Sequence, residues 1–357
     1  MAGGCERCPM AKAEGFIVDF PTLADVQDPW VQAHCSVPDG FDKGRPFVMS
    51  DDQFYCTAQH YRVRSSAKWQ PRRPMKAQAF MHRRSLIVGP QKSGKGPWSA
   101  TIAALEAVGP SLFAGWAGAG DGYACADWGC NCGFEHEYQP GEPMGMPQPT
   151  PLIQLTAPSA DAVDNVYRPL TSMIKMGPLA DIMLVREGFI RLPGEDNRID
   201  IVTAAANSRL GNPISFALHD EAGLYTKANK LLKVAETQRR GAAGMDGRTM
   251  ATTNAWDASE NSYAQQTWES TAKDVFKFWR RPSKSLSWGN RRDRRKILEE
   301  VYSSSPWVTL ASIEAEIDDL METDPAQAER FFGNRETTGM GAWLEAGLWE
   351  RAYANAS

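Results

Sequence analysis

The chain of 357 residues is long enough to form one large domain and a smaller one, each with its own hydrophobic core. Its 42% hydrophobic and 23% charged residues are typical of a soluble globular protein, with no apolar run near the roughly 20 residues of a membrane span and no apolar secretory signal at the N-terminus. The net charge of -4 argues against bulk electrostatic coating of nucleic acid, and we expect a cytoplasmic protein.

The first clear element is an apolar strand at 86–88, followed by a glycine-rich turn and a helix predicted over 97–107. The turn GPQKSGKG nearly matches G-x-x-x-x-G-K-[ST], the loop whose backbone N–H groups surround phosphates. Lys95 stands at the lysine position, but Gly96 lacks the hydroxyl that holds magnesium. The predicted nucleotide-binding residues are Gly89, Pro90, Gln91, Lys92, Ser93, Gly94, Lys95 and Gly96.

A cysteine-rich segment follows this helix. Cys125, Cys130 and Cys132 lie close to His136 in the sequence CADWGCNCGFEH. Zinc takes about four thiolate or imidazole ligands, so this segment could supply a complete site. The spacing is not that of a common zinc finger, and the glycine-rich surroundings are also typical of a surface loop. The odd number of cysteines, seven, argues against a disulfide framework.

Further apolar runs typical of strands occur at 152–156, 199–204, 214–219 and 248–253. Because these runs do not alternate with polar residues, they indicate a parallel sheet covered by helices on both faces. Helix-compatible runs lie between several of them, at 159–176 and 227–240. The sequence therefore predicts an α/β domain.

Polar residues stand where two of these strands end. Asp220 and Glu221 follow one strand, which places one carboxylate near magnesium and the next near an attacking water. Asn254 follows another, at the edge where a parallel sheet presents groups to a nucleotide, although a plain turn residue would look the same. Arg209 lies before Asp220 and could stabilise charge in a neighbouring subunit's site. Together with the loop, these residues predict binding of ATP and Mg²⁺.

Beyond residue 256 the predicted elements change to helices with charged faces, which indicates a smaller subdomain. The stretch 279–296 is basic and 311–324 is acidic, and each run is also typical of a solvated surface. Arginines of the basic stretch are candidates for non-sequence-specific contacts with DNA phosphates: Arg280, Arg281, Arg291, Arg292, Arg294 and Arg295.

Taken in order, the segments PFVMSDDQ, GPQKSGKGP, SRLGNP, FALHDEAG, TTNAWD and AERFFGNRETTGMGAWLEAGLWERA resemble the ATPase half of the large terminase subunits of tailed bacteriophages. The resemblance implies a P-loop NTPase fold of the additional-strand, catalytic-glutamate class. It also implies an ATP-driven motor that moves double-stranded DNA into a procapsid in the host cytoplasm. The implied partners are the portal protein, the small terminase subunit and further copies of the chain in a ring, pentameric when docked.

The resemblance also implies residue roles. Lys95 would bind phosphates, Asp220 would support magnesium and Glu221 would activate water. Asn254 would couple hydrolysis to movement, and Arg209 would act in trans. Lys92 stands where the family carries a basic loop residue, and Gln53 is similar to the glutamine that reads adenine, although a helix-start residue would look the same.

From the same resemblance we expect a P-loop ATPase domain at 1–256, including the adenine-binding region, and a helical linker or lid at 257–357. We expect no nuclease domain in this chain and therefore no DNA cutting. At Gly96 a water would replace the missing hydroxyl ligand, and replacing Gly96 by Thr should then raise turnover. Two alternatives stay open: another ring-forming P-loop ATPase that translocates nucleic acid, and a catalytically weak ATP-binding assembly subunit.

Overall fold

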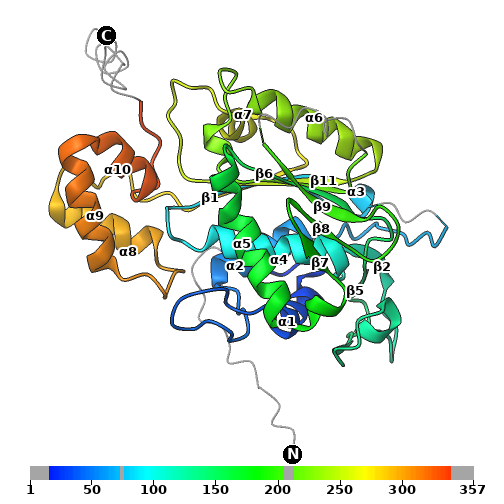
Figure 1. Ribbon diagram of the computed structural model, residues 1–357. Coiled ribbons are helices and arrows are strands. Elements are labelled where there is room, and N and C mark those ends of the chain that lie inside the picture. Colours follow the sequence, from blue (N-terminus) through cyan, green and yellow to red (C-terminus); the bar gives the residue numbers. More distant parts are fainter. Residues whose placement is uncertain (1–15, 73–75, 204–212, 339–357) are drawn as a thin grey trace, which may run out of the picture.

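An eight-stranded sheet organises the larger part of the molecule (Figure 1). The computed structural model describes residues 16–72, 76–203 and 213–338. The strands are β1 (Arg84–Val88), β6 (Leu152–Thr156), β7 (Leu184–Arg186), β8 (Phe189–Arg191), β9 (Arg198–Val202), β10 (Phe216–His219), β11 (Arg248–Thr253) and β12 (Val275–Trp279). Pairing is parallel from β12 to β9 in the order β12-β1-β11-β10-β6-β9, and β8 and β7 complete the sheet in antiparallel pairing. The predicted mostly parallel sheet is confirmed.

The strand order brings three predicted site segments to one edge of the sheet. β11 lies between β1 and β10, so one additional strand separates the strand before the glycine-rich turn from the strand before Asp220. These strands run parallel, and their carboxyl ends therefore meet at the same edge. This is the order expected for the additional-strand class.

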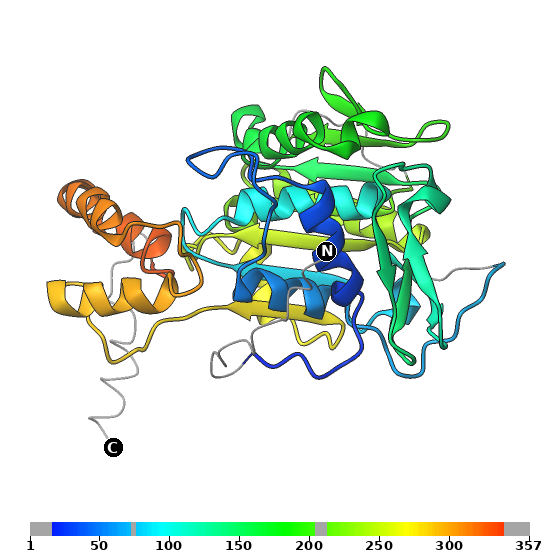
Figure 2. The ribbon, with the colours of Figure 1, turned by 90° about the horizontal axis from the view of Figure 1, so that it is seen from below.

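Helices cover both faces of the sheet (Figures 1 and 2). On one face lie α1 (Ala24–His34), α2 (Asp51–His60), α4 (Lys95–Val108) and α5 (Ala160–Met176), and on the other α6 (Leu231–Gly244) and α7 (Tyr263–Glu269); a short α3 spans Lys76–Ala79. Every residue of α4 from Trp98 to Ala107 is buried, because α4 packs between the sheet and its neighbouring helices. Among the described residues, no helix is both long and apolar enough to cross a lipid bilayer.

A buried ion pair ties α4 to β11. The Arg248 guanidinium donates to the Glu106 carboxylate at 3.0 Å and to the main-chain oxygen of His60 at 2.6 Å. It also lies over the rings of Tyr61 and Phe80. A buried charge is tolerated when it is paired and hydrogen-bonded in this way. The pair therefore fixes the helix that follows the glycine-rich turn against β11, the strand directly before Asn254.

Two small antiparallel pairs lie beside the main sheet. β2 (Leu112–Trp116) pairs with β5 (Pro143–Met146), and β3 (Gly122–Ala124) pairs with β4 (Glu135–Glu137). A 3₁₀ turn over Cys125–Trp128 follows β3 directly, within the cysteine-rich segment. A two-stranded hairpin is marginal alone, so β3 and β4 depend on contacts with the rest of the fold.

The predicted domain division at residue 256 is corrected by the structure. β12 lies within the predicted helical part, yet it pairs in parallel with β1 over its whole length, from Val275 opposite Arg84 to Trp279 opposite Val88. Its apolar residues complete the edge of the main sheet next to β1. We therefore use "helical subdomain" for residues 280–338, which contain α8 (Arg291–Val301), α9 (Leu310–Thr323) and α10 (Pro325–Phe331) around a small apolar core of their own.

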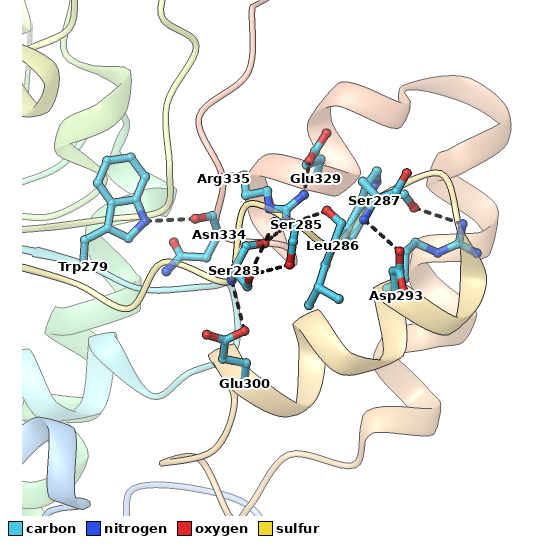
Figure 3. Close-up of polar contacts among 12 residues, drawn as sticks. Trp279, Ser283, Ser285, Leu286, Ser287, Asp293, Glu300, Glu329, Asn334 and Arg335 are labelled. Carbon is cyan, nitrogen blue, oxygen red and sulfur yellow. Dashed lines mark hydrogen bonds and ion pairs between the residues drawn. The ribbon is translucent and has the colours of Figure 1, made fainter. Parts of the chain in front are cut away.

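Polar contacts tie the two ends of the helical subdomain together (Figure 3). The indole of Trp279 donates to the main-chain oxygen of Asn334 at 2.9 Å, where the chain returns to the main sheet. The Arg335 guanidinium donates to the main-chain oxygens of Ser283 and Leu286. The outgoing and returning segments therefore run side by side and form the connection between the two parts of the molecule.

Acidic α9 neutralises part of the basic α8. Arg294 lies 3.3 Å from Asp318, and Arg295 lies 2.9 Å from Glu314. The opposite charges of the two predicted surfaces thus face each other between the helices. Among the DNA-contact candidates on α8, Arg291 and Arg292 are exposed at the start of the helix.

Candidate nucleotide-binding site

The turn between β1 and α4 has the geometry of a phosphate-binding loop. Gly94 caps α4 in the left-handed conformation, with φ of 81°, which glycine adopts without strain. A Cβ on Gly94 would also lie 2.7 Å from the ring of Trp307. The first N–H groups of α4 have no partner within the helix, and with the helix dipole they favour an anion at this end.

The Lys95 ammonium is held inside the loop. Its Nζ donates to the main-chain oxygens of Gly89 at 2.9 Å and Pro90 at 2.7 Å, and to Oδ1 of Asn254 at 2.9 Å. These three bonds use all three donors of the ammonium group. A phosphate oxygen would form a charge-assisted bond with Lys95, stronger than its bonds to these neutral acceptors.

Polar groups at the ends of β10 and β11 complete the site. The buried Asp220 carboxylate accepts a hydrogen bond from the Thr252 hydroxyl at 2.8 Å. Asn254 bridges two groups, since its Oδ1 accepts from Lys95 and its Nδ2 donates to Glu221 at 3.2 Å. Glu221 has φ of 55°, a left-handed conformation that is uncommon for a non-glycine residue and is often found at functional sites. The structure thus brings Lys95, Asp220, Glu221 and Asn254 together.

The charged groups of this cluster have shifted pKa values. Burial raises the pKa of Glu221 to about 6, an effect that the charge of Asp220 reinforces and that of Lys95 opposes. Burial also raises the pKa of Asp220, against the hydrogen bond from Thr252. Burial lowers the pKa of Lys95, against the attraction of the two carboxylates. Desolvated acidic groups beside one cation are typical of a site built for a charged ligand.

The raised pKa of Glu221 predicts a pH-dependent gain in stability for Glu221→Gln. An acid whose pKa rises on folding favours the folded state below its unfolded pKa, and this advantage is lost as the pH rises through about 6. The free energy of unfolding of the variant should therefore exceed that of the wild type by about 2 kcal/mol at pH 8, and by less than half of that at pH 5. Urea unfolding at both pH values, with exposed Glu316→Gln as control, tests this; an equal difference at both would contradict it.

Gly96 is required by a close approach of α5. A Cβ on Gly96 would meet the main-chain oxygen of Asn165 well inside 3.0 Å, a separation that real Cβ contacts essentially never show. This contact argues against the expectation that Gly96→Thr raises turnover, because a threonine there would push α5 away from the loop. Sequence reasoning missed this because the clash comes from a helix distant in the chain.

The Asn165 main-chain oxygen that faces Gly96 has no N–H donor one turn further along α5, because the residue there is a proline. Pro169 lies inside α5, four residues after Asn165, and has no N–H to donate to the Asn165 carbonyl. The side chain of Asn165 also hydrogen-bonds Asp220. The main-chain oxygen of Asn165 therefore faces Gly96, where the phosphate-binding motif has a hydroxyl, and Asp220 lines the same cleft. Such a set of hard oxygen atoms fits Mg²⁺.

A second pocket adjoins the loop on the side of α2. It is lined by Gln53, Ile87, Phe278, Arg280 and Val301, among others. Gln53 serves two purposes: its Oε1 accepts from the Ser50 N–H in the capping box of α2, and its Nε2 points toward the Gly94 carbonyl at 3.4 Å. Its walls combine apolar side chains with the polar groups of Gln53 and Arg280, a mixture typical of small-molecule sites.

Arg280, a DNA-contact candidate, belongs to this pocket. Its guanidinium forms a bidentate ion pair with Asp52, and Phe16 stacks on it. Arg281 lies over the Trp279 ring. Both guanidinium groups are therefore engaged within the chain.

The helical subdomain contacts the loop through main-chain atoms. The Tyr302 hydroxyl donates to the Gln91 oxygen at 2.7 Å, and the Gln91 N–H donates to the Phe331 oxygen at 2.7 Å. The Trp307 indole donates to the Lys92 oxygen at 3.1 Å. The subdomain thus forms one wall of the cleft beside Lys95, which Arg168 of α5 also lines. No motif in the sequence indicates Asn165, Arg168, Tyr302 or Trp307.

The predicted residue Arg209 falls in 204–212, outside the described residues.

The prediction of His136 as a zinc ligand is corrected, since the three cysteines gather around His34 instead. His136 lies on β4, and its ring packs edge-on against Tyr138 at 4.9 Å. Proximity in sequence suggested His136, whereas folding brings His34 from the end of α1.

The sheet order, the loop between β1 and α4, and the acidic pair after β10 define a P-loop NTPase fold of the additional-strand class. Neither the models of known protein families nor the curated proteins match this sequence. Among solved structures, the chain is similar to the HK97 bacteriophage large terminase, with a TM-score of 0.59 and 13% identity over 88% of this chain.

The match covers 55% of the HK97 protein, so this chain spans about half the length of that terminase. The Thermus phage P74-26 large terminase ATPase domain also matches, with a TM-score of 0.42 and 11% identity over 75% of this chain and 95% of that one. A third match is the large terminase of thermophilic bacteriophage D6E in complex with ATP-gamma-S, with a TM-score of 0.40, 10% identity and coverage of 72% and 48%. The match above a TM-score of 0.5 shows that this chain shares the fold of the part of the HK97 large terminase that it covers.

Proposed function

We propose that this chain is the ATPase part of a DNA-packaging motor that translocates double-stranded DNA into a viral procapsid. The observation that carries the proposal is the chain of contacts from Lys95 through Asn254 to Glu221, beside buried Asp220. It joins the phosphate-binding group to the catalytic carboxylate through one amide. The fold shared with the HK97 large terminase supports a DNA-packaging motor over other ring-forming ATPases.

ATP would occupy the adjoining cleft and pocket, with its base near Gln53 and its phosphates on the loop N–H groups and Lys95. Mg²⁺, when bound, supplies charge neutralisation at the β- and γ-phosphates, and the oxygens of Asp220 and Asn165 would hold it. Glu221 would accept a proton from the attacking water and orient it in line with the γ-phosphate. When a phosphate binds, Lys95 would donate to it and release its hydrogen bond to Asn254.

The remaining parts of the proposal concern assembly. Arg209 of an adjacent copy would stabilise the transition-state charge, so the complete site would form in a ring, pentameric when docked on the portal protein in the host cytoplasm. The small terminase subunit would be a further partner. DNA would be bound through its phosphates, for which exposed Arg291 and Arg292 are the available candidates on α8.

The test is ATP hydrolysis as a function of protein concentration, with and without double-stranded DNA. A site completed between copies predicts that turnover per chain rises with concentration, and that DNA raises it further with a steep dependence on salt. Turnover per chain that is independent of concentration and DNA would overturn the motor function. ATP binding without turnover under all conditions would instead identify an assembly subunit, and strand separation would identify a helicase.

A further inference from the structure

A compact cluster of three cysteines and one histidine lies outside the nucleotide site. It consists of His34 at the end of α1 and of Cys125, Cys130 and Cys132 in the segment between β3 and β4. The four potential ligand atoms all lie within 4.8 Å of one another. His34, Cys125 and Cys130 are buried, and Cys132 is partly buried.

The distances in the cluster match those of a tetrahedral metal site. Nε2 of His34 lies 3.4 Å from the sulfur of Cys125, 3.7 Å from that of Cys130 and 3.1 Å from that of Cys132. Tetrahedral zinc bonds of about 2.3 Å to sulfur and 2.0 Å to nitrogen separate a nitrogen and a sulfur ligand by about 3.5 Å. The observed distances lie on both sides of this value.

The histidine is oriented as a metal ligand. Its Nδ1 lies 2.7 Å from the main-chain oxygen of Trp30, to which it donates its proton, so Nε2 presents its lone pair to the three sulfurs. Such a bond on the second ring nitrogen is the usual support for a ligating histidine. The Trp30 ring stacks on the imidazole at 4.1 Å and fixes its plane.

The cysteine segment is shaped to turn its sulfurs inward. Gly129, between Cys125 and Cys130, and Gly133, directly after Cys132, have positive φ of 82° and 79°, a conformation in which a larger residue would be strained. The Phe134 N–H donates to the sulfur of Cys132 at 3.4 Å, a bond that stabilises a thiolate. Three cysteines cannot all pair in disulfides, whereas three thiolates and one neutral imidazole are a complete zinc ligand set.

We propose that His34, Cys125, Cys130 and Cys132 bind one structural zinc ion. The ion joins α1 to the β3–β4 hairpin, across 91 to 98 positions of sequence. All four ligand positions belong to the protein, which is the arrangement of structural rather than catalytic zinc. The teal segment with the cysteines lies on the side of the molecule opposite the orange helical subdomain (Figures 1 and 2). The zinc therefore acts on the stability of the hairpin, apart from the nucleotide cleft.

The experiment measures zinc in the full chain, purified without chelator, by plasma emission spectrometry. The wild type and His136→Gln should each carry about one zinc, and Cys132→Ser and His34→Gln about a tenth of that or less. Chelation with phenanthroline should lower the wild-type melting temperature by roughly 5 °C or more, and Zn²⁺ but not Mg²⁺ should restore it.

The wild type provides a readout that does not depend on the folding of any variant. Cobalt exchanged into it should give a thiolate-to-cobalt charge-transfer band of a tetrahedral site. A wild type with about a tenth of a zinc or less, equal loss of zinc in His136→Gln, or iron in place of zinc would each overturn the proposal. None of these measurements involves ATP, so they are separate from the test of the motor function.

Discussion

Glu221→Gln is expected to lower the rate of ATP hydrolysis by about 10²–10⁴-fold, because a glutamine cannot accept the proton of the attacking water. The amide has nearly the same shape as the carboxylate and keeps an oxygen for the bond from Asn254. ATP affinity should therefore change little. Steady-state hydrolysis and equilibrium binding of a fluorescent ATP analogue measure the two effects separately.

Lys95→Ala is the matched comparison for this variant. Its ammonium is the group placed to reach phosphates, so its removal should weaken binding as well as turnover. Exposed Glu316→Gln on α9 controls for the loss of one negative charge. Wild-type turnover in Glu221→Gln would show that another group activates the water, and the assignment of Glu221 would fail.

Gly96→Thr is expected to weaken ATP binding, by about 5–150-fold where the 1–3 kcal/mol typical of overpacking falls on the ATP-bound form. The added atoms would meet the Asn165 main-chain oxygen, and relief of the clash requires α5 to move away from the loop. The direction is opposite to the one that the phosphate-binding motif alone suggests. Isothermal titration with ATP in the presence of Mg²⁺ measures the effect.

Gly244→Thr provides the control for this substitution. Gly244 is the last residue of α6, and a Cβ there meets no atom within 4 Å. The same chemical change is therefore made on a helix where space is free, and ATP binding should not change. If Gly96→Thr binds ATP as well as or better than the wild type, the approach of α5 is not what excludes a side chain at residue 96.

The sequence predicted the elements whose chemistry is local. Strands β1, β6, β9, β10 and β11 were each indicated by their apolar runs, and the glycine-rich turn by its motif. Lys95 was indicated by its position in that motif, and Glu221 by its place directly after an apolar strand of a parallel sheet.

Contacts between distant segments were not predictable in this way. β12 was missed because its run VFKFW is short, and it follows segments that are typical of helices. Asn165 contacts Gly96 only through the packing of α5 on α4, and His34 joins the cysteines only through the placement of α1. No spacing rule relates these pairs, because the fold as a whole determines their distance.

The bonds between the helical subdomain and the phosphate-binding loop involve main-chain groups of Gln91 and Lys92. The contacts of the subdomain therefore depend on the backbone conformation of the loop rather than on the identity of its side chains. If a nucleotide that reshapes this backbone changes the free energy of docking the subdomain, thermodynamic reciprocity requires docking to change nucleotide affinity by the same amount. A protein that binds the helical subdomain and shifts its docking would then change nucleotide affinity, and so act as a nucleotide exchange factor, without contacting the nucleotide.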